Sequence, residues 1–284
     1  MPRIETIRDA GGSVCEDLVR TTAGAAWVLD GTSGFGDRSF TDAASDGRWY
    51  VETLDAALRS RIDRDGPLDA LLEASIADTA EDLAQCVPDS ADSSLETAVK
   101  RYELPACTAS VLRWDDDRIE YLTLCDASTL YRRSDGGTER ITSPGILDEI
   151  DAETQRRRNL ARAGGETTDR DVRAYIRETR QYANTPGGYW VAQTNPLAAR
   201  FATDGTIERT EVDAVVLHSD GLDPIVEVHD ALTDWGAVLS AAISEGAEAV
   251  VEELRRAESA LPKSASTGVR TGDDVALALV GFTE

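Results

Sequence analysis

The stretch AAWVLDGTSGFGD, residues 25–37, places an Asp-Gly-Thr directly after an apolar run. The apolar residues 25–29 are typical of a buried strand, and an Asp-Gly dipeptide often forms the turn that ends one. Asp30 therefore stands where a strand ends. Its carboxylate is a turn residue, a metal ligand or a nucleophile, and the rest of the chain favours a metal ligand.

The roles of turn residue and nucleophile can be judged from the residues around Asp30. Asp-Gly is foremost a turn dipeptide, and the chain repeats it at 46–47, 65–66, 135–136 and 204–205, so any one copy is most often a turn. A nucleophilic role would require the haloacid dehalogenase motif, Asp-x-Asp-Gly-Thr, in which the first aspartate attacks. Val28 occupies that position, and a valine cannot attack phosphorus.

The composition is that of an acidic globular protein. Of 284 residues, 41% are hydrophobic, which is enough for a core, and 53 acidic residues against 29 basic ones give a net charge of −24. Such a surface repels nucleic-acid phosphates and anionic membranes, so we expect neither as a partner. Adaptation to high salt would explain the acidity, and so would an arginine-using cytosolic protein from a GC-rich genome; both readings stay open.

The cysteines and the amino terminus indicate a cytoplasmic protein. No two of the four cysteines, Cys15, Cys86, Cys107 and Cys125, form a Cys-x-x-Cys pair, so a thiolate metal site is not expected. The first residues, MPRIETIRDAGG, lack the apolar region of a signal peptide, and no apolar run is long enough to span a membrane. We therefore expect a soluble protein of the cytoplasm.

Hydrophobic patterning predicts strands and helices in separate groups. Strands are expected at 17–30 (a pair joined at 23–24), 107–113, 118–125, 128–133, 187–193, 212–219 and 275–282. Helices are expected within 40–60, after Pro67, across 146–183 with a break at 164–165, and across 233–259. Because few helices directly link neighbouring strands, antiparallel sheets with helices packed outside fit better than a doubly wound parallel sheet.

Acidic residues stand at the ends of several expected strands. Three of them follow apolar runs, one pair precedes the first strand, and another pair precedes the last: Asp30, Asp126 and Asp220; Glu16-Asp17; Asp273-Asp274. Adjacent strands lie about 4.8 Å apart, so carboxylates at their ends can converge on one rim of a sheet. Their repulsion favours a divalent cation, and oxygen ligands without His or Cys favour Mg²⁺ or Mn²⁺.

In this order the acidic motifs resemble those of the protein phosphatase 2C family, the metal-dependent serine/threonine phosphatases. The matching segments lie within residues 12–282 and are CED (15–17), DGTSG (30–34), CDAS (125–128), SDGL (219–222) and DDVALALV (273–280). The resemblance implies an α+β fold, a four-layer α-β-β-α sandwich of two antiparallel sheets flanked by helices. It also implies a single domain over residues 1–284, with a flap-like helical insert around 132–184.

The same resemblance implies a hydrolase whose partner is a phosphorylated protein. Its substrates would be phosphoserine and phosphothreonine, attacked by a water activated between two Mg²⁺ or Mn²⁺ ions, with a third ion as a further expectation. The implied catalytic positions are Asp30, Asp220 and Thr32. The implied metal ligands are Glu16, Asp17, Asp30, the Gly31 carbonyl, Asp126, Asp220 and Asp273.

Two positions depart from the family pattern. Thr32 replaces the histidine assigned as the acid for the leaving alcohol, and loss of a general acid costs roughly 10²–10⁴ in rate. Gly12 replaces the arginine that grips the substrate phosphate, with Arg8 as a candidate substitute. His218 is a candidate for the acid, although a histidine in an apolar strand more often packs in the core. An alternative function is therefore a catalytically weak or inactive regulatory module that binds phosphoproteins.

The segment 132–184 is rich in arginine. Its arginines include Arg156, Arg157, Arg158, Arg162, Arg170, Arg173, Arg177 and Arg180. Such side chains either collect an anionic phosphopeptide or pair with acidic neighbours on a solvated helix face, and the helical spacing favours pairing. A nucleotide or acyl hydrolase on another fold has no support, because the chain contains neither a P-loop nor a Gly-x-Ser-x-Gly motif.

Overall fold

Two antiparallel sheets of five strands each form the centre of the molecule. The computed structural model describes residues 2–88, 95–143, 147–162, 167–260 and 272–282. Sheet I has the order β1 (Arg3–Asp9), β10 (Val275–Gly281), β9 (Val212–His218), β6 (Ser128–Arg133) and β7 (Thr138–Ile141). Sheet II has the order β2 (Leu18–Thr21), β3 (Ala25–Thr32), β4 (Ala106–Trp114), β5 (Arg118–Leu124) and β8 (Thr203–Glu208).

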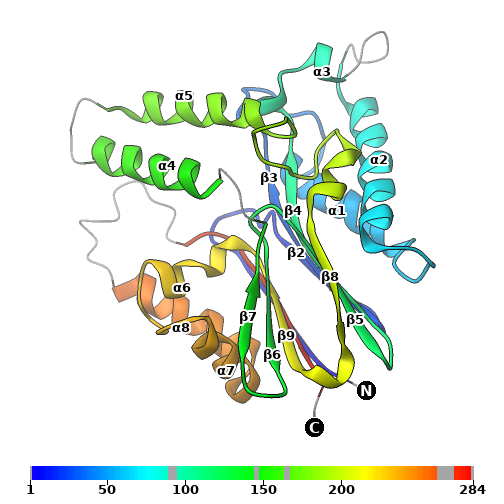
Figure 1. Ribbon diagram of the computed structural model, residues 1–284. Coiled ribbons are helices and arrows are strands. Elements are labelled where there is room, and N and C mark those ends of the chain that lie inside the picture. The colour runs from blue at the N-terminus through cyan, green and yellow to red at the C-terminus, as the bar shows by residue number, and fades with distance from the viewer. Residues whose placement is uncertain (1, 89–94, 144–146, 163–166, 261–271, 283–284) are drawn as a thin grey trace.

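Helices cover the outer face of each sheet, and Figure 1 shows the resulting layers. α1 (Asp46–Arg59) and α2 (Leu68–Cys86) pack on sheet II, with the short α3 (Leu95–Ala98) beyond them. α7 (Trp235–Glu245) and α8 (Ala247–Ala260) pack on sheet I, next to the short α6 (Pro224–Glu227). The expected α+β fold, a four-layer α-β-β-α sandwich, is confirmed.

The central strands are buried on both faces, which explains their continuous apolar runs. Val28 of β3 packs between the sheets, in one cluster with Val215 of β9 and Ala278 of β10. Its neighbours Trp27 and Leu29 face the other way, into the cluster that includes residues of α1 and α2. Packing from both sides fixes β3, and it thereby fixes the acidic residue near the end of this strand.

A pair of helices lies beyond one end of the sheets rather than on their faces (Figure 1). α4 (Leu147–Arg162) and α5 (Asp169–Thr179) pack on each other and lie between β7 and β8 in the chain. A capping box begins α5: the Thr168 hydroxyl accepts from Asp171 N, and the Asp171 carboxylate accepts from Thr168 N at 2.8 Å. This helix carries Arg170, Arg173 and Arg177.

The structure corrects several expected elements. The single helix across 233–259 is two helices, because Gly246, with a φ of 102°, ends α7 and α8 begins directly after it. The strand at 187–193 is wrong: among the described residues this segment forms only isolated bridges, such as Ala192 to Cys107. The break at 164–165 lies outside the described residues. β1, β7 and β8 are edge strands whose half-exposed pattern lacks a strong apolar signal, so the sequence did not predict them.

Candidate metal centre

The predicted acidic residues meet at one end of the two sheets. In sheet II the register of β2 and β3, continued by one residue, sets Asp17 opposite Asp30. In sheet I the register of β6 and β9, continued by two residues, sets Asp126 opposite Asp220. Between β5 of sheet II and β6 of sheet I, Cys125 adopts a φ of 68°, and this turn carries Asp126 from one sheet to the other.

Asp30 lies in the middle of this group. The carboxyls of Asp17 and Asp220 lie near enough to act electrostatically on it. Burial, and then the charges of Asp17, Asp220 and Asp126, hold the pKa of Asp30 well above its usual range. Raised pKa values favour the protonated form of these carboxyls, and a divalent cation that binds there would displace the protons.

Asp17 has a buried oxygen with unused hydrogen-bonding capacity. Burial raises the pKa of Asp17 to about 7; a hydrogen bond from Ser219 opposes this rise, and the charge of Asp274 adds to it. The Oδ2 atom is buried, and no residue that the structure describes donates a well-aligned hydrogen bond to it. Such an oxygen calls for an explanation, and a cation that binds there would supply one.

Asp220 and Asp273 complete the group. Asp220 begins the 3-10 helix Asp220–Leu222 after β9, and burial together with the charge of Asp126 raises its pKa well above the usual range. Asp273 precedes β10 and is exposed, yet its charge raises the pKa of both Asp17 and Asp220. The structure thus brings the predicted aspartates close enough to repel one another.

Asp274, the next residue, has a structural role instead. It is buried; its Oδ1 accepts a hydrogen bond from Gly11 N and its Oδ2 accepts one from Glu16 N, each at 2.8 Å. A Cβ at Gly11 would lie 2.4 Å from the carbonyl oxygen of Gly272, so only glycine fits this close approach. Asp274 therefore fastens the amino-terminal loop, and Asp17 with it, to the start of β10.

Glu16 lies beside the aspartates, and Ser33 holds its carboxylate. Ser33 N donates to Oε2 at 3.1 Å, and the Ser33 hydroxyl donates to Oε1. A Cβ at Gly47 would lie 2.7 Å from the carboxyl carbon of Glu16, so the first turn of α1 packs directly on this side chain. A Cβ at Gly31 would lie 2.5 Å from the Glu16 carbonyl oxygen. Glu16 and Gly31 are therefore in close contact at the edge of the group.

Thr32 is held by an arginine that the sequence did not single out. Arg180, just after α5, donates from Nη2 to Thr32 Oγ1 at 2.6 Å and from Nη1 to the Ser33 carbonyl at 3.0 Å. Its guanidinium lies over the Phe35 ring, 4.4 Å from the centroid, and near enough to Asp126 for their charges to interact. The positive charge of Arg180, from the segment after α5, therefore lies beside the acidic group. No pattern in the sequence distinguishes Arg180 from its neighbouring arginines.

His218 does not supply the missing acid. It is fully buried in β9, where Nδ1 lies 2.9 Å from the Ser219 carbonyl and the ring stacks on Trp235. Burial lowers the pKa of His218 to about 3, so the ring is neutral near pH 7. Asp223 lies 3.6 Å from Nδ1, forms an ion pair with Arg140 at 2.8 Å, and has a pKa raised to about 7 by burial. The sequence analysis missed Asp223, although it follows the SDGL motif directly.

The chemistry of this group fits a hard divalent cation. In the described part of the chain, no three His, Cys, Asp or Glu side chains already form an ion cage. The charges of Asp17 and Asp220 nevertheless act on Asp30 at this site. All the side chains that converge here offer oxygen, their charges repel, and one buried oxygen lacks a donor. These features suit Mg²⁺ or Mn²⁺ better than a metal that requires nitrogen or sulfur.

Solved structures of bacterial phosphatases share this architecture. The serine/threonine phosphatase PstP/Ppp of Mycobacterium tuberculosis gives a TM-score of 0.62 at 17% identity, covering 100% of this chain and 99% of that one. The catalytic domain of PstP in complex with two manganese ions gives 0.57 at 18%, covering 99% and 97%. Stp1 of Staphylococcus aureus gives 0.55 at 15%, covering 99% and 95%.

The chain therefore has the fold of the bacterial serine/threonine phosphatases, and the resemblance to the protein phosphatase 2C family is confirmed at the level of the fold. No protein-family model matches the sequence, and no curated protein matches it. Among the helices that the structure describes, none is long and apolar enough to cross a membrane.

Proposed function

We propose that this protein is a metal-dependent phosphoprotein phosphatase that hydrolyses phosphoserine and phosphothreonine. One observation carries the proposal: Asp17, Asp30 and Asp220 converge where the two sheets end, and the charge of Asp126 acts on the same group. The likeness to PstP, whose catalytic domain is in complex with two manganese ions, supports the proposal.

The proposed cofactors are two Mg²⁺ or Mn²⁺ ions, with a third as a further candidate. Asp30 would bridge the pair. The remaining ligands would be Glu16 and the Gly31 carbonyl on one side, Asp220 and Asp273 on the other, Asp126 at the third ion, and Asp17 through a water molecule. Glu16 would have to share its carboxylate with Ser33. When bound, such a pair of ions supplies a water of lowered pKa as the nucleophile.

Arg180 is our candidate for the residue that holds the substrate phosphate, in the absence of an arginine at Gly12. Two of its nitrogens donate to Thr32 Oγ1 and the Ser33 carbonyl, which orient the planar guanidinium. The guanidinium is largely shielded from solvent, and this burial lowers the pKa of Arg180. A guanidinium has five N–H donors in all and can bind a phosphate through two of them. Thr32 is then a residue that positions Arg180.

Departure of the alcohol is the slow step that we expect. Thr32 cannot donate a proton as an imidazolium would, and His218 is buried and neutral. A leaving group that needs no proton, such as a phenolate, would then react faster than the alkoxide of serine. We therefore expect aryl phosphates to be better substrates than phosphoserine peptides.

The lack of a general acid at Thr32 and His218 favours a second candidate function. Without an acid for the leaving group, the protein would act as a regulatory module that binds phosphoproteins and turns them over slowly or not at all. Both functions use the metal centre, and they differ only in the turnover that follows binding.

Phosphate release from p-nitrophenyl phosphate and from a phosphoserine peptide, with Mn²⁺ and with excess chelator, tests the proposal. Manganese-dependent turnover that Asp30→Asn abolishes would support the phosphatase. Manganese binding in a calorimeter and phosphopeptide binding, with turnover no higher than in Asp30→Asn, would favour the regulatory module. An Asp213→Asn variant is a matched control, because this aspartate lies at the opposite end of β9. Failure to bind manganese at all would contradict both functions.

A further inference from the structure

A groove of about 1050 Å³ runs along α5, outside the acidic group. Cationic side chains line it from two elements: Arg170, Arg173 and Arg177 from α5, and Lys100 from the turn that faces the helix. Lys100 is one of only two lysines in the chain. We call this feature the α5 groove. A cluster of cations is unusual on a protein whose net charge is −24.

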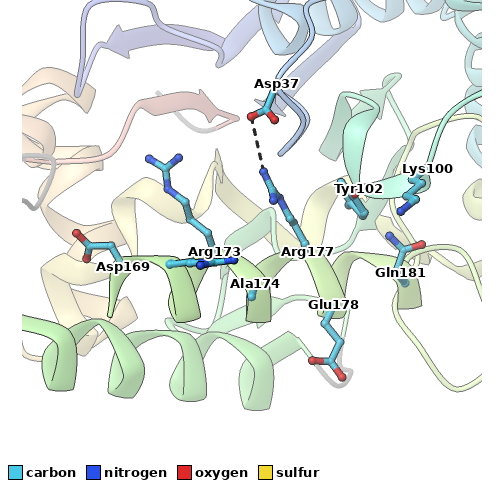
Figure 2. Close-up of a pocket in the computed structure, with 10 residues that line it drawn as sticks. Asp37, Lys100, Tyr102, Asp169, Arg173, Ala174, Arg177, Glu178 and Gln181 are labelled. Carbon is cyan, nitrogen blue, oxygen red and sulfur yellow. Dashed lines mark ion pairs between the residues drawn. The ribbon is translucent and has the colours of Figure 1, made fainter. Parts of the chain in front are cut away.

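Three acidic residues, Asp37, Asp169 and Glu178, also line the α5 groove beside the four cationic ones. In Figure 2, Glu178 and Arg177 leave α5 in different directions, and Arg177 projects toward Asp37. Arg177 and Asp37 are 3.9 Å apart, and the Asp37 side chain is 99% exposed, so this is a loose surface contact. Among the described residues neither Arg170 nor Arg173 forms an ion pair, although the charge of Arg170 acts on Asp171 and lowers its pKa.

The arginines of α4 differ from those of α5. Arg156 and Arg157 both pair with Glu153 at 2.6 Å, as expected for a solvated helix face with intrahelical ion pairs. The predicted pairing therefore holds for these arginines of α4, whereas Arg170 and Arg173 present their charge to the groove. Unpaired cations around a hollow are available to an anionic ligand.

The α5 groove is continuous with the metal centre. Arg170, Arg173, Arg177 and Arg180 follow one another at helical spacing, so they lie along one side of the helix. Phe35 connects the two regions: its carbonyl accepts a hydrogen bond from Arg177 Nε at 2.9 Å, and its ring lies under the guanidinium of Arg180. The row of arginines therefore ends at the residue that contacts Thr32.

We propose that the α5 groove binds the acidic flank of a phosphoprotein segment whose phosphorylated residue lies at the metal centre. This inference rests on the proposed function and specifies its substrate class. From Arg170 to Arg180 the helix rises roughly 15 Å, at about 1.5 Å per residue. An extended peptide covers that length in about four to five residues. Acidic residues within about five positions of the phosphorylated residue, on one side of it, therefore face the arginines.

Three phosphoserine peptides of equal length test this inference. One carries a block of aspartates before the phosphoserine, one carries the block after it, and one is neutral. Binding is measured by fluorescence anisotropy and turnover by phosphate release, both with Mn²⁺. The test variant is Arg170→Glu combined with Arg173→Glu. The matched control is Arg59→Glu, because Arg59 is exposed at the end of α1.

We expect one acidic peptide to bind about five- to tenfold more tightly than the neutral peptide, and the double variant to remove that preference. Hydrolysis of p-nitrophenyl phosphate should be unchanged in the double variant, because this small substrate does not reach the groove. Equal affinity for all three peptides would overturn the inference, and so would an equal loss in Arg59→Glu. Absence of turnover with the affinity difference retained would refute the phosphatase and leave the acidic docking site intact.

Discussion

Arg180 donates a hydrogen bond of 2.6 Å to the hydroxyl of Thr32, and this contact links the segment after α5 to the end of β3. The two residues are 148 positions apart in the sequence. A cation from one part of the molecule is therefore held beside a group of carboxylates from both sheets.

Substitution of Arg180 tests its proposed role in holding phosphate. We expect Arg180→Ala to raise KM for aryl phosphate and phosphopeptide by about tenfold or more, because a charge-assisted, bidentate contact is lost. Arg180→Lys should recover part of this loss, since a lysine keeps the charge without the planar fork. Manganese affinity should not fall, because Arg180 is not among the proposed ligands and its charge repels a cation. A fall in both kcat and manganese binding would indicate a structural role instead.

Gly12→Arg tests whether the missing family arginine can be restored. A Cβ at Gly12 meets no atom within 4 Å, so the larger side chain fits without displacing the backbone. We expect KM for aryl phosphate to fall by about three- to tenfold, with an unchanged melting temperature. Gly11→Arg is the control: its Cβ would lie 2.4 Å from a backbone oxygen, and the protein should lose stability. An unchanged KM in a stable Gly12→Arg would argue that Arg180 already provides all the phosphate binding.

The pKa of Asp17 predicts how pH acts on the metal-free protein. This carboxyl has a pKa of about 7 when folded, against 3.8 for an unperturbed aspartate. The folded state therefore binds more protons, and the free energy of unfolding falls as the pH rises from about 4 to about 7. Because the side chain is buried, the loss is on the order of a few kcal/mol. Saturating manganese should remove this pH-dependent loss of stability, because the bound cation replaces the protons.

The comparison with Asp17→Asn isolates this effect. His218, whose pKa is lowered to about 3, acts in the opposite direction below its ordinary pKa, so wild type alone would show a mixture. Denaturant unfolding of both proteins at several pH values, with chelator, gives the difference. A wild type that gains stability relative to Asp17→Asn as the pH rises would contradict the prediction.

The neighbours Asp273 and Asp274 should respond differently to the same substitution. Asp274→Asn weakens two hydrogen bonds from backbone N–H groups to a buried carboxylate, and we expect a loss of about 2–4 kcal/mol in the free energy of unfolding. Asp273→Asn should leave the melting temperature of the metal-free protein nearly unchanged, because this residue is exposed. It should lower manganese affinity instead. Calorimetric titration and thermal denaturation of both variants separate the two roles, and identical behaviour would refute them.

The acidic group could be predicted because each of its aspartates has a signal in the neighbouring sequence. Each aspartate stands where an apolar run begins or ends, and the ends of paired strands meet in space whatever the exact topology. Asp274 had the same signal as Asp273, and only the hydrogen bonds to Gly11 and Glu16 reveal that its role is structural. Local sequence therefore located the rim but did not assign every residue on it.

Contacts that depend on distant packing could not be predicted. Arg180 lies in a run of arginines that all fit a solvated helix, and its contact with Thr32 follows from where α5 lies against the loop after β3. β1 was missed for a related reason: as an edge strand it is half-exposed, so its apolar pattern is weak. In both cases the deciding partner is remote in the sequence.

The pairing of β1 with β10, and the bonds from Asp274 to the amino-terminal loop, join the earliest and latest parts of the fold. A nascent chain on the ribosome cannot make these bonds until residues 273–281 have emerged. The loop that carries Glu16 and Asp17, made early in translation, is therefore fastened beside Asp274 only when the last strand forms. The proposed metal centre is thus complete only after the last strand has joined the sandwich.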